Sequence, residues 1–388
     1  MNKERKHIIF LTRWYPHRYD PMFGLFVQSH AEAAALFNDI TVIYCHACER
    51  QQDNKTTRQQ AKKFEIVRTN ENNVDTIRVY YKKPKNKIQS LLRFYRANMM
   101  ALKLCKKPDL IHVHVLTRLG VIAWIQKILH KTPYIITEHW SRYLPGNDFS
   151  GFLRKTACKL VVRNAKTVTT VTENLATAMN NHGLKNDNYV VLPNVVNLDM
   201  FHINQKCTDA INHVPTIIHI SCFEDKSKNI SGLLESLKII DDKGIDFQCK
   251  LIGEGMDLDL MKEKAKNLQL INKVSFTGLL QGQALADELS SGDFLVLSSN
   301  YENMPVVILE ALASGLPVVS TNVGGIKEMI DDTKGILVEP RNKEALAEAM
   351  IKMIETHKNY DANYLRNSVI EKYGYESVGM FLSRLYNK

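Results

Sequence analysis

Long hydrophobic runs are absent from this sequence of 388 residues. No apolar stretch approaches the roughly 18–20 residues that a helix needs to cross a bilayer. At the amino terminus, only four consecutive apolar residues follow the basic start NKERKH. That run is too short for a signal-peptide core and is typical of a first strand. We therefore expect the protein to stay in the cytoplasm.

Paired cysteines and glycine-rich dinucleotide motifs are also lacking. The seven cysteines are odd in number and scattered, which favours reduced thiols over a disulfide framework. Cys45 and Cys48 form a single C-x-x-C without a second ligand pair, so we interpret them as packed thiols near a strand end. No G-x-G-x-x-G follows the first strand, which disfavours a dinucleotide dehydrogenase.

Acidic residues are scarce in one half of the chain only. Residues 1–200 hold 31 basic and 15 acidic side chains, whereas the whole chain has a net charge of +10. The second half is therefore acidic. This asymmetry indicates an anionic surface that only one domain touches.

The segment Lys82–Lys107 contains nine basic residues and no acid. Six apolar residues within it fall at helical spacing on one face: Ile88, Leu91, Leu92, Tyr95, Met99 and Leu102. Such a helix can lie on an anionic membrane surface, which would make the protein peripheral on the inner face of the cytoplasmic membrane. The alternative is a surface helix packed on its own domain. Because no nucleic-acid motif accompanies it, we expect no nucleic acid partner.

Short apolar strands alternate with helical patterns along the whole chain, which predicts βαβ units and parallel sheets. The length favours two domains. We expect an α/β fold of two facing Rossmann-like, doubly wound domains with a ligand cleft between them. The predicted limits are 1–196 for the first domain, 197–215 for the linker and 216–371 for the second, with a terminal helix at about 372–388 packing back on the first.

The stretch from Asp293 to Gly325 carries the clearest chemistry. A buried strand at Phe294–Ser298 ends in a polar loop, and a helix begins near Met304-Pro305 and stops at Gly315. This arrangement places a helix amino terminus at the carboxyl end of a parallel strand. Backbone amides and the helix dipole there make a site for a diphosphate.

Glu302 lies just before this helix and Glu310 lies within it, about 7–8 Å of helical rise from its start. Carboxylates accept hydrogen bonds from paired hydroxyl groups, so two of them can bracket a nucleotide diphosphate sugar. One would hold sugar hydroxyls and the other the ribose. Solvated helix glutamates are the alternative, but the strand, loop and helix context favours the site.

At this point the sequence resembles the retaining glycosyltransferases of family 4, which have the GT-B fold. ENMPVVILEALASGLPVVSTNVGG is similar to the E-x7-E signature of that family. The other matches follow the family's order along nearly the whole chain: DPMFGLFVQSHAEA, IITEHWS, VLPNVVNLDMF, LIGEG and FTG.

The resemblance implies a role for each matching residue. Glu302 would contact the donor sugar, Lys228 would neutralise the leaving diphosphate, and His139 would lie near the sugar. The remaining donor contacts are Gly24, Gly253, Asn303, Met304, Pro305, Val306, Val307 and Glu310, the last holding the ribose. Because Lys228 supplies positive charge, we expect no metal and no cofactor besides the nucleoside diphosphate sugar.

Two positions depart from the family pattern. Phe223 stands where the family commonly has an arginine, so one cation is missing unless Lys226 or a residue of the first domain replaces it. Val196 and Asn197 stand where glycine and aspartate are frequent, which weakens inference about the hinge only.

The expected function is retaining transfer of a sugar to a hydroxyl of a saccharide or lipid-linked saccharide, in cell-surface polysaccharide or glycolipid biosynthesis. Other GT-B activities, a nucleotide-sugar epimerase or a phosphorylase, are the nearest alternatives. A non-catalytic sugar-nucleotide-binding protein is the alternative from another class. The nucleotide, sugar, linkage and oligomeric state stay open.

Overall fold

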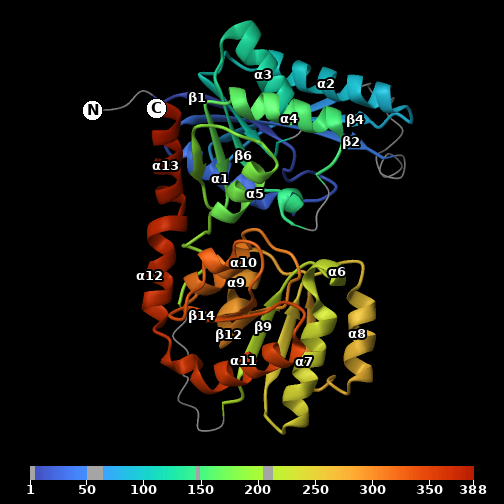
Figure 1. Cartoon of the computed structure of the whole chain (residues 1–388), viewed down its shortest axis with the longest axis vertical. Helices are drawn as coiled ribbons and strands as arrows, with labels where there is room; N and C mark the ends of the chain where they lie inside the picture. The colour runs from blue at the N-terminus through green and yellow to red at the C-terminus, as the bar shows by residue number, and fades with distance from the viewer. Residues whose placement is uncertain (1–4, 50–63, 117, 146–148, 204–212) are drawn as a thin grey trace. The chain divides into compact units, whose positions relative to one another are not determined.

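The structure, a computed structural model, describes residues 5–49, 64–116, 118–145, 149–203 and 213–388 (Figure 1). The chain divides into two compact units. The first comprises residues 1–171, 176–195 and 375–388, and the second comprises residues 172–175 and 196–374. Of the segment 197–215, expected as a linker, the described residues 197–203 and 213–215 belong to the second unit. Residues 204–212 lie outside the described ones.

The first unit is built on an eight-stranded sheet with the order β3-β4-β2-β1-β5-β6-β7-β8. All neighbouring strands pair in parallel except β3 and β4. The strands are β1 (His7–Thr12), β2 (Asp39–Cys48), β3 (Glu65–Glu71), β4 (Val74–Lys82), β5 (Leu110–His114), β6 (Tyr134–Glu138), β7 (Thr167–Thr170) and β8 (Tyr189–Val191).

Helices accompany this sheet along the chain. They are α1 (Leu25–Ala35), α2 (Lys87–Lys103), α3 (Arg118–His130), α4 (Phe152–Asn164), α5 (Glu173–Asn181) and the carboxyl-terminal α13 (Tyr375–Asn387), with a 3-10 turn at Ser141–Tyr143. α13 packs on α1 so closely that a Cβ at Gly379 would lie 2.3 Å from the Ala33 carbonyl oxygen. Leu382 and Leu385 of α13 join the core of this unit.

The antiparallel hairpin of β3 and β4 departs from the βαβ units and parallel sheets that the sequence predicts. Its turn carries Asn72 and Asn73, both with positive φ, of 51° and 62°. Two such residues between alternating strands are typical of a type I′ turn. The Asn-Asn pair before VDTIRVYYK was therefore the sequence signal for this hairpin.

The second unit contains a six-stranded parallel sheet with the order β11-β10-β9-β12-β13-β14. Its strands are β9 (Thr216–Ile220), β10 (Gln248–Ile252), β11 (Val274–Gly278), β12 (Phe294–Leu297), β13 (Val318–Thr321) and β14 (Gly335–Val338). Its helices are α6 (Asp225–Lys228), α7 (Ile230–Asp242), α8 (Leu258–Asn267), α9 (Gly282–Ser291), α10 (Val306–Ala313), α11 (Lys343–Thr356) and α12 (Ala362–Tyr373), with 3-10 turns at Ile326–Glu328 and His357–Asn359.

Both units therefore have the doubly wound α/β architecture that the sequence predicts. The helix expected within Lys82–Lys107 is shorter in the structure. Lys82 ends β4, and α2 begins at Lys87 because the Asn86 side chain accepts hydrogen bonds from the next turn's amides. None of the helices in the described part of the chain combines the length and the apolar character that crossing a membrane requires.

Candidate active site

The loops that follow β9 and β12 lie at the point where the strand order of the second sheet reverses. β9 lies between β10 and β12, so successive strands are added outward from it on both sides. In doubly wound sheets, ligands bind beyond the carboxyl ends of the strands at such a switch point. The loop after β9 leads into α6, and the loop after β12 leads into α10. A ligand at this edge would touch both loops.

Lys228 and Glu302 form an ion pair at this edge. The Lys228 Nζ lies 2.6 Å from Oε1 of Glu302, and both side chains are largely buried. Ser299 Oγ donates a second hydrogen bond to the same oxygen at 2.8 Å. Burial opposes the charge on Lys228, but the Glu302 carboxylate outweighs it, so the pKa of Lys228 is raised. The lysine is therefore positively charged here.

Further hydrogen bonds join the two loops that carry this ion pair. Ser298 Oγ donates to the backbone carbonyl of Lys228 at 2.9 Å. The backbone amide of Asn300 donates to the Ser227 carbonyl at 2.7 Å. Because each loop is bonded to the other through its backbone, the positions of the ammonium and carboxylate groups are fixed relative to one another.

The helix amino terminus that the sequence predicts lies beside the ion pair. α10 begins at Val306 with Pro305 as its N-cap, and Gly315 follows its end with a left-handed φ of 76°. The first amides of a helix have no intrahelical carbonyl partner, and they favour an anion. This end of α10 is therefore suited to a phosphate group.

The glycine pair Gly324-Gly325 packs directly against the loop before α10. A Cβ at Gly324 would lie 1.9 Å from the Glu302 carbonyl oxygen, and its φ of +60° also favours glycine. The Gly325 amide donates to the carbonyl of Asn303 at 3.0 Å. Asn303 and Met304 are buried, so they shape the loop from within, while Val306 and Val307 are half-buried.

Glu310 lies on α10, five residues after the N-cap. Burial raises the pKa of its carboxyl group to about 7. Among the residues that the structure describes, the Glu310 side chain has no hydrogen-bond or ion-pair partner. It therefore differs from Glu302, whose charge is already matched by Lys228.

Gly253 supports the loop after β9 from behind. Its φ is +137°, and a Cβ there would lie 1.9 Å from the Ser221 carbonyl oxygen. Phe223, which stands where the resemblance implies an arginine, is fully buried and belongs to the core of the second unit. Lys226 is exposed on α6. Lys228 is thus the cation that contacts Glu302, and Phe223 takes a packing role.

In the first unit, the loop after β1 carries Gly24. Gly24 is the N-cap of α1 with a left-handed φ of 76°, and a Cβ there would lie 2.5 Å from the Trp14 backbone. The Trp14 ring lies 5.3 Å from the ring of Trp140, which follows His139 in the loop after β6. Gly24 and His139 are therefore carried by neighbouring loops at the carboxyl ends of β1 and β6.

His139 is buried within a group of histidines. Its Nε2 lies 3.1 Å from Nδ1 of His114, and the two rings stack at 5.4 Å. Burial lowers the pKa of His139 well below its usual value, and neighbouring histidines lower it further. His112 and His114 are also fully buried. At neutral pH, His139 is therefore a neutral hydrogen-bonding group rather than a cation.

Glu138 is not among the site residues predicted from the sequence, but it holds the loop that carries His139. Its carboxylate accepts hydrogen bonds from the amides of His139 at 2.9 Å, Trp140 at 2.8 Å and Leu116 at 2.8 Å. The side chain is fully buried, and burial raises its pKa. A carboxylic acid at a buried strand end, immediately before the histidine in ITEHW, was the signal for this positioning residue.

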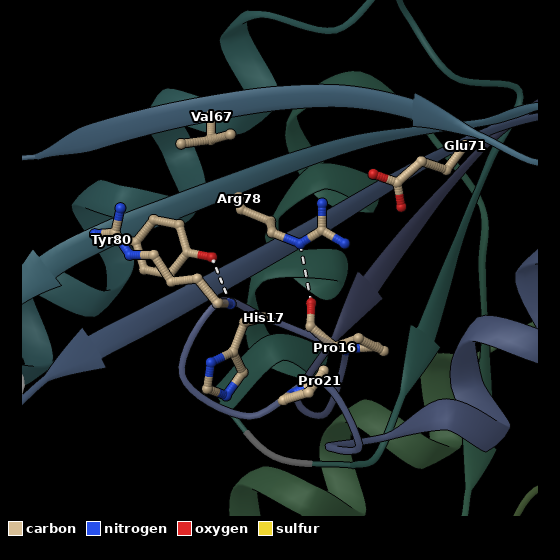
Figure 2. Close-up of a pocket in the computed structure, with 8 residues that line it drawn as sticks. Pro16, His17, Pro21, Val67, Glu71, Arg78 and Tyr80 are labelled. Atoms are coloured by element: carbon tan, nitrogen blue, oxygen red, sulfur yellow. Dashed lines mark hydrogen bonds between the residues drawn. The ribbon is translucent and has the colours of Figure 1, made fainter. Parts of the chain in front are cut away.

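The first unit also contains an open pocket of about 340 Å³ beside the β3–β4 hairpin (Figure 2). The Arg78 Nε donates to the Pro16 carbonyl at 2.9 Å, and the Arg18 guanidinium lies over the Tyr80 ring at 3.9 Å. The residues that line the pocket are Pro16, His17, Arg18, Pro21, Val67, Glu71, Arg78 and Tyr80. These do not include any site residue expected from the sequence.

Two family models cover most of the chain between them. A "Glycosyl transferase 4-like domain" matches residues 28–195, and "Glycosyl transferases group 1" matches residues 208–369. With the two doubly wound units and the loops described above, these matches define the class. The chain belongs to the family 4-like glycosyltransferases of the GT-B fold.

Among its relatives, TuaC of Bacillus subtilis is 26% identical over 357 residues, which is 88% of each chain. Its name assigns it to teichuronic acid biosynthesis as a glycosyltransferase. Two solved structures share the fold at lower identity. Sucrose-phosphate synthase of Thermosynechococcus elongatus has a TM-score of 0.78 at 19% identity, covering 99% of this chain and 98% of its own. Anabaena HepE with UDP-glucose has a TM-score of 0.71 at 15% sequence identity, and the match covers 99% of this chain and 100% of HepE.

Proposed function

We propose that this glycosyltransferase moves a sugar from a nucleoside diphosphate sugar to a hydroxyl of a saccharide or lipid-linked saccharide, with retention of anomeric configuration. The observation that carries the proposal is the Lys228–Glu302 ion pair beside the amino terminus of α10. It combines a fixed cation, a carboxylate and a helix amino terminus at one sheet edge. Those are the groups that a sugar diphosphate requires.

In this proposal, the bond between the anomeric carbon and the diphosphate oxygen breaks, and its electron pair leaves with the diphosphate. Lys228 and the amides at the start of α10 stabilise the negative charge that develops there. Glu302 accepts hydrogen bonds from sugar hydroxyls, and Glu310 accepts them from the ribose. The acceptor oxygen bonds to the anomeric carbon and gives up its proton to the departing diphosphate. Because Lys228 supplies the positive charge, no metal is required for this step.

The proposed roles of the first unit concern the sugar and the acceptor. His139, neutral and hydrogen-bonded, would contact the sugar, and Gly24 would allow a ligand to approach the backbone closely. The HepE structure, solved with UDP-glucose, supports a nucleotide sugar as the donor. The name of TuaC supports a cell-surface polysaccharide as the product.

A donor screen tests the proposal against its alternatives. The chain should release nucleoside diphosphate from one of the UDP-, GDP- or ADP-sugars, slowly with water and faster with a saccharide acceptor. An epimerase would convert the sugar without an acceptor, and a phosphorylase would require phosphate. Binding without any release or conversion would indicate a non-catalytic protein and contradict the proposal.

We also propose that the first unit rests on an anionic membrane surface on the cytoplasmic side. The helices α2, α3 and α4 together carry ten basic residues and no acid. α2 contacts α3 through Met99 and Gln126, and α3 packs against α4 (Figure 1). Large apolar side chains on these helices are exposed: Ile88, Leu92, Ile128, Leu129, Phe152, Leu153 and Leu160.

α2 itself has the features of an interfacial helix. Its buried residues are Ala97, Asn98 and Ala101, so small side chains face the domain. Ile88 and Leu92 are 69% and 63% exposed. The alternative, a surface helix that hides its large apolar residues on its own domain, does not account for these two positions.

Neutralising three exposed cations of α2 should weaken binding to vesicles that contain phosphatidylglycerol. At about 1 kcal/mol per cation, the loss is about 100-fold in partition coefficient. The variant replaces Lys87, Arg96 and Lys103 by glutamine, and co-sedimentation at low salt measures it. The matched control replaces three exposed lysines of the second unit, Lys262, Lys266 and Lys352, by glutamine. Equal binding by both variants, or none by the unaltered protein, would refute the membrane surface.

A further inference from the structure

Three side chains meet at the end of the second sheet that is opposite the donor loops. His213 lies three positions before the first residue of β9, Asp293 directly precedes β12, and His357 directly follows α11. Each offers one ligand atom, and these atoms lie within 4.8 Å of one another. The four residues of β12, about 13 Å of strand, separate Asp293 from the loop that carries Glu302. This cluster is therefore distinct from the donor site.

Asp293 is the centre of the cluster. Its side chain is 3% exposed, and its Oδ2 accepts hydrogen bonds from the Thr216 amide at 2.7 Å and from Nε2 of His213 at 2.8 Å. The carboxylate is thus held by β9 on one side and by His213 on the other. Its second oxygen, Oδ1, points toward His357.

The ring of His357 has a defined tautomer. Its Nδ1 lies 3.0 Å from the Ile354 carbonyl and 3.3 Å from the Met353 carbonyl. A carbonyl oxygen can only accept, so Nδ1 carries a proton. In the neutral ring, Nε2 then has a lone pair. This atom is buried and makes no hydrogen bond in the described part of the chain, and the side chain is 9% exposed.

The spacing between His357 and Asp293 does not fit a direct hydrogen bond. Nε2 lies 3.9 Å from Oδ1, which is beyond hydrogen-bond length. Because Nε2 of His357 and Oδ1 of Asp293 face each other at this distance, one small cation can bridge them.

We propose that His213, Asp293 and His357 bind a Zn²⁺-like divalent cation. Two imidazole nitrogens and one carboxylate are typical ligands of zinc. Tetrahedral zinc with bonds of about 2.0–2.1 Å holds its ligand atoms about 3.3 Å apart. The distance from His213 Nε2 to Asp293 Oδ2 is 2.8 Å, and that from His357 Nε2 to Asp293 Oδ1 is 3.9 Å. These two distances lie on either side of about 3.3 Å. The hydrogen bonds from His357 Nδ1 to backbone carbonyls are the support that metal-bound histidines usually have.

Binding needs little rearrangement. The cation takes the place of the hydrogen between His213 and Asp293, and His213 then carries its proton on Nδ1. A fourth position remains for water. The His213 side chain is 27% exposed, which gives the cation a path from solvent. The bound ion would join the starts of β9 and β12 to the end of α11 and so stabilise the second unit without entering the transfer reaction.

Titration of the tag-free full chain with Co²⁺, followed by competition with Zn²⁺, tests this site. We expect one ion per chain, with the strong visible absorption of four-coordinate Co²⁺, and a higher melting temperature with Zn²⁺ but not with Mg²⁺. His357→Gln and His213→Gln should each lower the Zn²⁺ affinity by at least about tenfold, the smallest loss that even outer-shell changes produce.

His202→Gln is the matched control, because His202 is an exposed histidine of the same unit outside the cluster. It should bind Co²⁺ like the unaltered chain. The proposal would be overturned if the unaltered chain failed to bind one ion. It would also be overturned if the His357→Gln and His213→Gln variants bound the ion as tightly as the unaltered chain does. The melting temperature without metal shows whether each variant is folded, and sugar transfer plays no part in the test.

Discussion

Replacing Lys228 by methionine should lower kcat by about 100- to 1000-fold, the size of effect seen when one group that stabilises transition-state charge is removed. The expected cause is loss of the ammonium that faces the leaving diphosphate. Methionine keeps the length of the chain while removing the charge. Steady-state release of nucleoside diphosphate measures the effect, with acceptor and donor both saturating.

The pairing of Lys228 with Glu302 leads to further expected results. In the Lys228→Met variant, Glu302 loses the partner that lies 2.6 Å away, so the protein should also melt at a lower temperature. Glu302→Gln should reduce turnover strongly, and the double variant should lose less than the product of the two single losses because the residues act as a pair. Lys262→Met, at an exposed lysine of α8, is the control. Near-normal turnover in Lys228→Met would refute the site.

Donor affinity should decrease as the pH falls below about 7. Burial raises the pKa of Glu310 to about 7, and the ionised carboxylate is the better acceptor for ribose hydroxyls. Below that pH the free protein is protonated at Glu310, so binding must first remove a proton. The limiting slope is about tenfold in Kd per pH unit. Calorimetry with the donor nucleotide between pH 5.5 and 8.5 measures it.

The control for this prediction is Glu310→Gln, which should bind the donor weakly and with no dependence on pH in this range. The raised pKa of Glu310 also determines whether the stability of the folded protein increases or decreases with pH. A folded-state pKa above the ordinary value means that the native protein holds the proton more tightly. The contribution of Glu310 to stability is therefore greatest at low pH and is lost as the pH rises through 7. A pH-independent Kd in the unaltered protein would contradict the role of Glu310.

The sequence contained most of the fold because its strands are short, buried and regularly separated by helices. In the second unit, β12 begins at Phe294, as the sequence predicts, and ends one residue before the predicted Ser298, and α10 begins one residue after Pro305. The hairpin of β3 and β4 was missed because β3 is an exposed edge strand. Many of its residues are polar, so its hydrophobic pattern is weak.

The sequence indicates candidate site residues but not the contacts between them. Glu302 and Lys228 were selected separately from motifs, and their ion pair depends on the folding together of segments 74 residues apart. The consequence of Phe223 could be read only from its burial in the core. The pKa of Glu310 likewise comes from surroundings that no local pattern encodes. Asp293 and His357 are 64 positions apart in the sequence, so their cluster gives no motif.

The anomeric configuration of the product tests the central claim most directly. With an α-linked nucleotide sugar as donor and a saccharide acceptor, proton NMR of the purified product reports the new glycosidic linkage. A retaining transfer through the Lys228–Glu302 site predicts an α linkage, formed by the unaltered protein and almost absent with Lys228→Met. A β linkage, or equal product from the variant, would contradict the account.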